Sequence, residues 1–119
     1  MADVGWAMRL AGYHAALPLG VQVLLKINIS WQHWYPATST SPWQLEGVVR
    51  ALREDGYADL VGAHNGTVVV DSFEGEVANK HKAVTDRVGL PTVHLDVPPN
   101  RWIPYQPKGE MLVLDRIFP

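Results

Sequence analysis

The sequence predicts an α/β fold in which helices cover both faces of a mostly parallel sheet. The first observation is the run Val21–Ile29, which is the most apolar and β-branched run of the chain, as is typical of strands in a parallel sheet. The second is a helical pattern that begins at Pro42 and ends at Gly56. The third is the alternation of strand and helix patterns, which right-handed crossovers assemble into one sheet. We therefore expect a three-layer, Rossmann-like βαβαβ domain.

Size and composition are those of a single globular domain. The chain has 119 residues, of which 47% are hydrophobic and 18% charged, so we expect one domain over residues 1–119. The formal net charge is -2 and the basic residues are scattered, so nucleic acid is not an expected partner. No apolar run approaches the roughly 18 residues of a membrane span, and no signal peptide opens the chain, so no membrane partner is expected.

The chain contains no cysteine. It therefore cannot form a disulfide, use a thiol nucleophile or ligate zinc or an iron–sulfur cluster through sulfur. No cofactor can be assigned to the chain from its sequence. The absence of cysteine fits a cytoplasmic protein, which is the location that we expect.

The N-terminal part of the chain predicts one helix and one strand. Apolar residues at helical spacing predict a helix over Gly5–Leu17, which Pro18 ends. The strand Val21–Ile29 follows. Lys26 and Asn28 place two polar side chains near the carboxyl end of this strand.

A long loop, Ser30–Ser41, connects this strand to the best-defined helix of the sequence. Ser41 suits the N-cap, Pro42 suits the first helical position, and Gln44 completes a capping box with Ser41. Gly56 suits the residue that follows a helix. The apolar stripe of this helix consists of Leu45, Val48, Val49 and Leu52.

The second half of the chain continues the alternation. Its expected elements are a strand at Leu60–Gly62, a turn at Asn65-Gly66, a helix at Glu74–Val88, a strand at Thr92–Val97 and a strand at Met111–Asp115. The residue period does not decide whether Thr67–Val70 is a short strand or an ordered loop.

Three segments in this series carry a resemblance to a known family. Lys26-Ile27-Asn28 closes a strand, Thr38-Ser39-Thr40-Ser41-Pro42 opens a helix, and Leu60-Val61-Gly62 forms the next strand. In this order and spacing, residues 20–115 resemble the N-terminal half of domain-of-unknown-function family 362. That family typically shows Lys-Pro-Asn at a strand end, a Thr-rich stretch before a Pro and a helix, and then a strand that ends in Gly-Asp. The later segment Val88-Gly89-Leu90-Pro91 also fits the family's pattern.

The resemblance implies an α/β sandwich, and a redox or iron–sulfur association that comes mainly through attached domains. Two departures limit what can be carried over. Ile27 stands where the family has Pro, and Ala63-His64 follows Gly62 where the family has Asp. Family members continue into a second half with further Lys and His motifs, which this sequence does not contain. We therefore expect an incomplete family domain.

Polar residues follow the predicted strands, where open parallel sheets bind their ligands. The candidate binding residues are Lys26, Asn28, Thr38, Ser39, Thr40, Ser41, His64, Asn65 and Gly66. Free N–H groups at the start of the helix from Pro42 favour a small anion such as phosphate or carboxylate, and Lys26 adds positive charge. The alternative is a purely structural role, in which Ser41 caps a helix, Asn65-Gly66 forms a turn and Lys26 is solvated.

The histidines suggest a metal site only weakly. His33 and His64 follow neighbouring strands, and Asp71 is a candidate third ligand, but no H-x-x-x-H or H-E-x-x-H spacing supports them. We therefore assign no metal. His81 and His94 are expected to be packed or solvated. No G-x-S-x-G, G-x-G-x-x-G or P-loop motif occurs, so no catalytic residue is assigned and the question of an enzyme stays open.

Aromatic residues gather in and around the loops: Trp31, Trp34, Tyr35, Trp43 and Trp102. They close a ligand pocket, or they cover sheet surface that the rest of the family domain would cover. In the second case the chain is a structural or interaction half-domain, which forms a homodimer or pairs with a complementary second polypeptide. Both hypotheses stand at this point.

Overall fold

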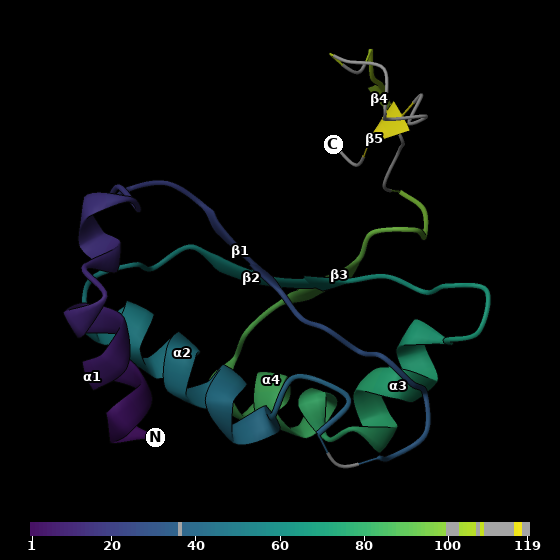
Figure 1. Ribbon diagram of the computed structural model, residues 1–119, viewed down its shortest axis with the longest axis horizontal. Coiled ribbons are helices and arrows are strands. Elements are labelled where there is room, and N and C mark those ends of the chain that lie inside the picture. The colour runs from purple at the N-terminus through teal and green to yellow at the C-terminus, as the bar shows by residue number, and fades with distance from the viewer. Residues whose placement is uncertain (36, 100–102, 107, 109–115, 118–119) are drawn as a thin grey trace.

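The computed structural model describes residues 1–35, 37–99, 103–106, 108 and 116–117. In these residues the protein is a mixed α/β structure with a three-stranded parallel sheet (Figure 1). The strands β1 (Val23–Lys26), β2 (Leu60–His64) and β3 (Thr92–His94) lie side by side in that order. A separate antiparallel pair consists of β4 (Ile103–Pro104) and β5 (Arg116–Ile117).

The helices connect the strands of the parallel sheet. They are α1 (Ala2–Leu10), the 3-10 helix η1 (Tyr13–Ala15), α2 (Pro42–Glu54), α3 (Ser72–Ala78) and α4 (His81–Val88). The chain crosses from β1 to β2 through α2, and from β2 to β3 through α3 and α4. Because both strand pairs are parallel, all three strands end at the same edge of the sheet. The predicted α/β class with a parallel sheet is confirmed.

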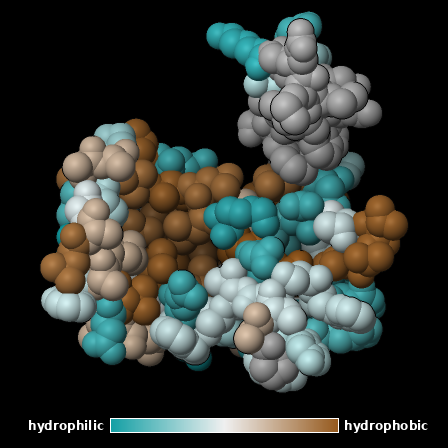
Figure 2. Space-filling model, viewed as in Figure 1, coloured by the Kyte–Doolittle hydropathy of each residue, from teal (hydrophilic) through white to brown (hydrophobic). Residues whose placement is uncertain are grey.

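The helices α2, α3 and α4 lie along one face of the sheet (Figure 1). The alternation in β1 shows the consequence, because Val23 is buried whereas Leu24 is 52% exposed. Figure 2 shows hydrophobic residues gathered on the surface over the sheet and beside α1. The second helical layer that we predicted is not found among the described residues.

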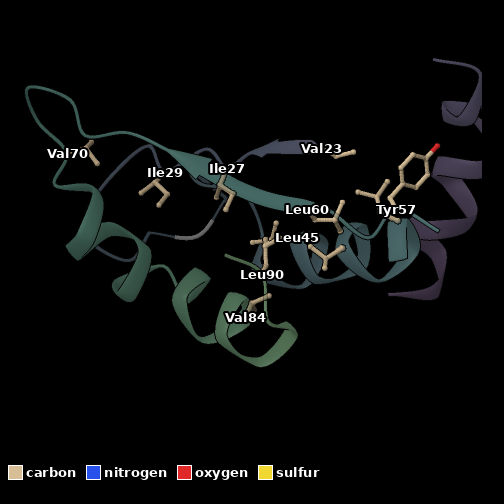
Figure 3. Packing of buried hydrophobic residues seen from close by; sticks show 11 residues of the cluster. Val23, Ile27, Ile29, Leu45, Tyr57, Leu60, Val70, Val84 and Leu90 are labelled. Atoms are coloured by element: carbon tan, nitrogen blue, oxygen red, sulfur yellow. The ribbon is translucent and has the colours of Figure 1, made fainter. Parts of the chain in front are cut away.

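The core lies between the sheet and these helices (Figure 3). Leu60 of β2 and Ile27, which directly follows β1, point toward Leu45 of α2 and Val84 of α4, and Leu90 lies among them. All five are buried, and burying a side chain of this size stabilises a fold by about 1.5–3 kcal/mol. The predicted apolar face of α2 is confirmed at three of its four residues, because Leu45, Val49 and Leu52 are all buried.

The first two predicted elements are shorter in the structure. The helix expected over Gly5–Leu17 divides into α1 and η1, because Gly12 adopts a left-handed conformation with φ 70°. The strand expected over Val21–Ile29 is reduced to β1, although the N–H of Ile27 still donates to Ala63 O at 2.8 Å.

The predicted helix over Glu74–Val88 is wrong as one element. It divides into α3 and α4 because Asn79 ends the first helix and Lys80 adopts φ 66°. The strand expected over Thr92–Val97 is reduced to β3. The open question at Thr67–Val70 is answered by an isolated antiparallel bridge between its two ends, and Met111–Asp115 lies outside the described residues.

Candidate functional site

The loop after β1 folds back on the end of that strand, where hydrogen bonds join three predicted site residues and Ser30. The N–H of Asn28 donates to Thr40 Oγ1 at 3.0 Å, and the N–H of Thr40 donates to Asn28 O at 2.9 Å. The N–H of Ser30 donates to Ser39 Oγ at 3.2 Å, and Asn28 Nδ2 donates to Ser30 Oγ at 2.8 Å. These polar atoms therefore hold the loop together.

Two further predicted residues also bond locally. Lys26 Nζ donates to the carbonyl of the next residue, Ile27, at 2.9 Å. Thr38 Oγ1 donates to Tyr35 O at 2.9 Å. Neither of these hydrogen bonds involves a residue of α2.

The start of α2 is the part of the predicted site that keeps free hydrogen-bond donors. The first helical bond runs from the N–H of Leu45 to Ser41 O at 3.0 Å, and Pro42 has no N–H. The N–H groups of Trp43 and Gln44 are therefore left without a helical partner. The predicted capping box is wrong, because the side chain of Ser41 makes no cap hydrogen bond and Gln44 is exposed.

A small cavity of about 130 Å³ opens beside this helix start. It is lined by Trp34, Tyr35, Ala37, Ser39, Thr40, Ser41, Pro42 and Asn79. Asn79 is 1% exposed, and its Nδ2 donates to Trp31 O at 2.8 Å and to Gly75 O at 3.0 Å. These two bonds fix the orientation of the amide. Asn79 Oδ1 is buried and has no hydrogen-bond partner among the described residues.

His81 fixes the loop against α4 next to this cavity. Its Nε2–H donates to Thr40 O at 2.6 Å, and the residue is 1% exposed. Burial lowers the pKa of His81, because a charged imidazole loses its hydration there. The neutral ring therefore acts as a positioning group for Thr40 and Ser41.

The remaining predicted site residues lie at the end of β2 and do not line this cavity. His64 is 1% exposed and its Nε2 lies 3.1 Å from Glu76 Oε2. Asn65 Nδ2 donates to Gly66 O at 2.8 Å, and the N–H of Gly66 donates to Asp96 Oδ1 at 2.9 Å. The structure therefore divides the predicted site into two groups.

The residues considered as weak metal candidates, His33, His64 and Asp71, do not form one ligand cluster among the described residues. His33 is exposed, with its ring centroid 6.3 Å from that of Trp31. Asp71 caps α3 by accepting from the N–H groups of Phe73 and Glu74. In the part of the chain that the structure describes, the cluster with suitable ligand atoms is instead His64, Glu76 and His94.

Glu76 and Asn79 were not predicted as site residues, and His94 was given no site role. An acidic residue and an amide on a short helix are usually solvated, and no motif marks either one. Only the position of α3 against the strand ends makes these side chains part of a site.

The aromatic residues of the loop form a separate feature. Trp31, Trp34 and Tyr35 are between 55% and 65% exposed. Together with His33 and Thr38 they line an apolar groove of about 350 Å³. Trp102 lies outside the described residues.

No family model, curated protein or solved structure matches the chain. Among the described residues, every helix is too short or too polar to span a bilayer.

Proposed function

We propose that this chain is a small-ligand-binding α/β domain whose ligand is an anion held at the start of α2. The observation that carries the proposal is the uncapped first turn of a 13-residue helix, which opens on a cavity that contains a buried amide. The N–H groups of Trp43 and Gln44 attract negative charge, and the helix dipole adds to this attraction. Ser41 supplies a hydroxyl at the same place.

The side chain of Asn79 favours an anion that also carries a hydrogen-bond donor. Its unpartnered Oδ1 is an acceptor, so a bare carboxylate would leave it unsatisfied, at a cost of about 1–3 kcal/mol. Asn79 Oδ1 is buried, so its side chain must shift toward the cavity before a ligand can reach it. After that shift a monohydrogen phosphate group satisfies both sides, because it accepts from the helix N–H groups and donates its own O–H to Asn79. A cavity of about 130 Å³ corresponds to roughly four water volumes, which is room for one phosphate group.

The test is a titration of the chain with inorganic phosphate, followed by calorimetry. The informative variant is Ser41→Asp, whose carboxylate occupies the N–H groups of the first turn and repels an anion. We expect Ser41→Asp to weaken phosphate binding by about tenfold or more while it stabilises α2. The control is Val68→Asp, which adds the same charge at a fully exposed residue outside both the cavity and the loop that forms it.

Two results would contradict the proposal. The first is a wild-type chain that binds no phosphate. The second is an equal loss of phosphate binding in the Val68→Asp and Ser41→Asp variants, which would assign the effect to net charge. Improved stability together with lost phosphate binding in Ser41→Asp alone supports the site.

A second candidate function is an interaction module that pairs with itself or with a second polypeptide. The groove of Trp31, Trp34 and Tyr35 favours it, because exposed aromatic patches are common at protein interfaces. Sedimentation velocity at high protein concentration tests self-pairing, with Trp34→Ser and Tyr35→Ser as disrupting variants. A monomer that binds no hydrophobic dye would rule this function out.

We also propose that the chain belongs to domain-of-unknown-function family 362 and that its sheet is Rossmann-like. The support is the order of the three motifs at Lys26-Ile27-Asn28, Thr38–Pro42 and Leu60-Val61-Gly62. In this proposal another helical layer covers the face that carries Leu24, and redox or iron–sulfur chemistry belongs to attached parts. A cytoplasmic location is part of the same proposal.

A further inference from the structure

A second polar cluster lies between the sheet and α3, and it uses other residues than the anion site. His64 ends β2, His94 ends β3 and Glu76 lies on α3. The strand register pairs His64 directly with His94, so the two imidazoles emerge at the same edge of the sheet. Their ring centroids are 4.3 Å apart.

The spacing of these side chains suits a metal ion. Glu76 Oε2 lies 3.1 Å from His64 Nε2 and 3.7 Å from His94 Nε2, and one ligand atom from each residue lies within 4.8 Å of the others. Two nitrogen or oxygen ligands on a tetrahedral zinc ion are about 3.3 Å apart, since each bond is about 2.0–2.1 Å long. The three atoms therefore need only small movements to share one ion.

Glu76 is a buried carboxyl group that a bound cation would stabilise. The residue is 6% exposed, and within the described residues no lysine or arginine forms an ion pair with it. Glu46 is equally buried, but it pairs with Arg50, at 2.8 Å, and with Arg87. A buried carboxylate without a cation costs several kcal/mol, and a divalent ion would remove that cost.

The packing and hydrogen bonding of the two histidine rings favour metal binding. The ring of His64 is 1% exposed and packs edge-on against the ring of His94. His94 Nδ1 lies 2.7 Å from Ser72 Oγ, and the ring of Phe73 stacks on it with a centroid distance of 3.7 Å. Such outer contacts hold the Nε2 atom of His94 toward Glu76, as they do for metal-bound histidines.

We propose that His64, Glu76 and His94 bind a divalent transition-metal ion and that zinc is the ion that best fits this donor set. Two imidazoles and one carboxylate are a donor set found for zinc in other proteins. Because the ligands come from β2, α3 and β3, the ion ties α3 to the ends of two strands. This site does not depend on the anion site, since the two share no residue.

The experiment is a zinc titration by calorimetry of chelator-washed protein in a phosphate-free buffer. The same titration with cobalt reports the ligand geometry through its visible absorption. We expect a stoichiometry of one and a melting temperature that rises with zinc concentration. The Glu76→Gln variant keeps the size and a hydrogen-bond acceptor but loses the charge, and we expect zinc affinity to fall by at least about 100-fold.

The control is His33→Ala, which removes an exposed histidine that lies outside the cluster. We expect this variant to bind zinc as the wild type does. Should Glu76→Gln fail to fold, His94→Gln is the second variant, with the same expected loss. Zinc binding that survives both cluster substitutions, that disappears in His33→Ala or that is absent from the wild type would overturn the proposal.

Discussion

Gly75 decides how closely α3 approaches the sheet, and Gly75→Ala is the sharpest test of this packing. A Cβ atom placed on Gly75 would lie 2.7 Å from Cγ2 of Ile29 and 3.6 Å from Cα of Gln32. Favourable carbon contacts are about 3.5–4.0 Å long. Ile29 is 7% exposed and belongs to the core, so it cannot move away without opening a gap elsewhere.

Two effects of opposite sign set the magnitude. Alanine is better than glycine inside a helix by about 1 kcal/mol, whereas forcing a methyl group into a packed core costs about 1–3 kcal/mol. We expect the cost to dominate and Gly75→Ala to lower the free energy of unfolding by about 1 kcal/mol. We also expect weaker zinc binding, because Glu76 moves with the helix.

The assay is urea denaturation of Gly75→Ala, Ile29→Ala and the double variant. With Ile29 truncated, the clash is absent, so Gly75→Ala should become stabilising, with a coupling of about 1–2 kcal/mol. Ala78→Gly on the same helix calibrates the propensity effect. If Gly75→Ala stabilises the wild-type chain by about 1 kcal/mol, as at an open helical position, α3 does not pack on Ile29 and the reasoning is wrong.

The remaining predictions concern buried polar groups. The buried hydroxyl of Tyr57 donates to Leu17 O at 2.7 Å. Tyr57→Phe should therefore lower the free energy of unfolding, measured by urea denaturation, by about 1–2 kcal/mol. An unchanged free energy of unfolding would refute that hydrogen bond. Burial lowers the pKa of His64 and His81, so below about pH 6.5 the unfolded chain binds more protons than the folded one. The free energy of unfolding of chelator-treated protein should therefore fall by up to about 1.4 kcal/mol per pH unit for each histidine, and a flat profile between about pH 7 and pH 5 would contradict the burial.

The parts of the fold that the sequence predicted correctly are those with strong local signals. The helix α2 has an apolar stripe and Pro42 at its first position, and both survive in the structure. The break between α3 and α4 was missed because Val77, His81 and Val84 keep a helical period across it. Asn79 and Lys80 make the break through a side-chain contact and a left-handed backbone, which no local pattern marks.

The candidate site was predicted only in part, because the sequence does not show which face of the sheet each polar side chain occupies. Polar residues after parallel strands do lie at one edge, as expected, but their side chains alternate between its two faces. His64 turns inward beneath α3, whereas Lys26 and Asn28 stay exposed. Which partners each side chain meets depends on the helix packed against that face, and here the helix supplies Glu76 and Asn79.

Both proposed sites therefore depend on the same short helix. α3 has seven residues, and a helix of that length is not stable alone in water, so its position comes from its contacts with the sheet and the loop. Glu76 completes the histidine cluster, and Asn79 at the end of the same helix reaches the cavity at α2. Because Gly75 is the point of closest approach to Ile29, a change there alters both sites together, whereas substitutions at Ser41 or His94 alter only one.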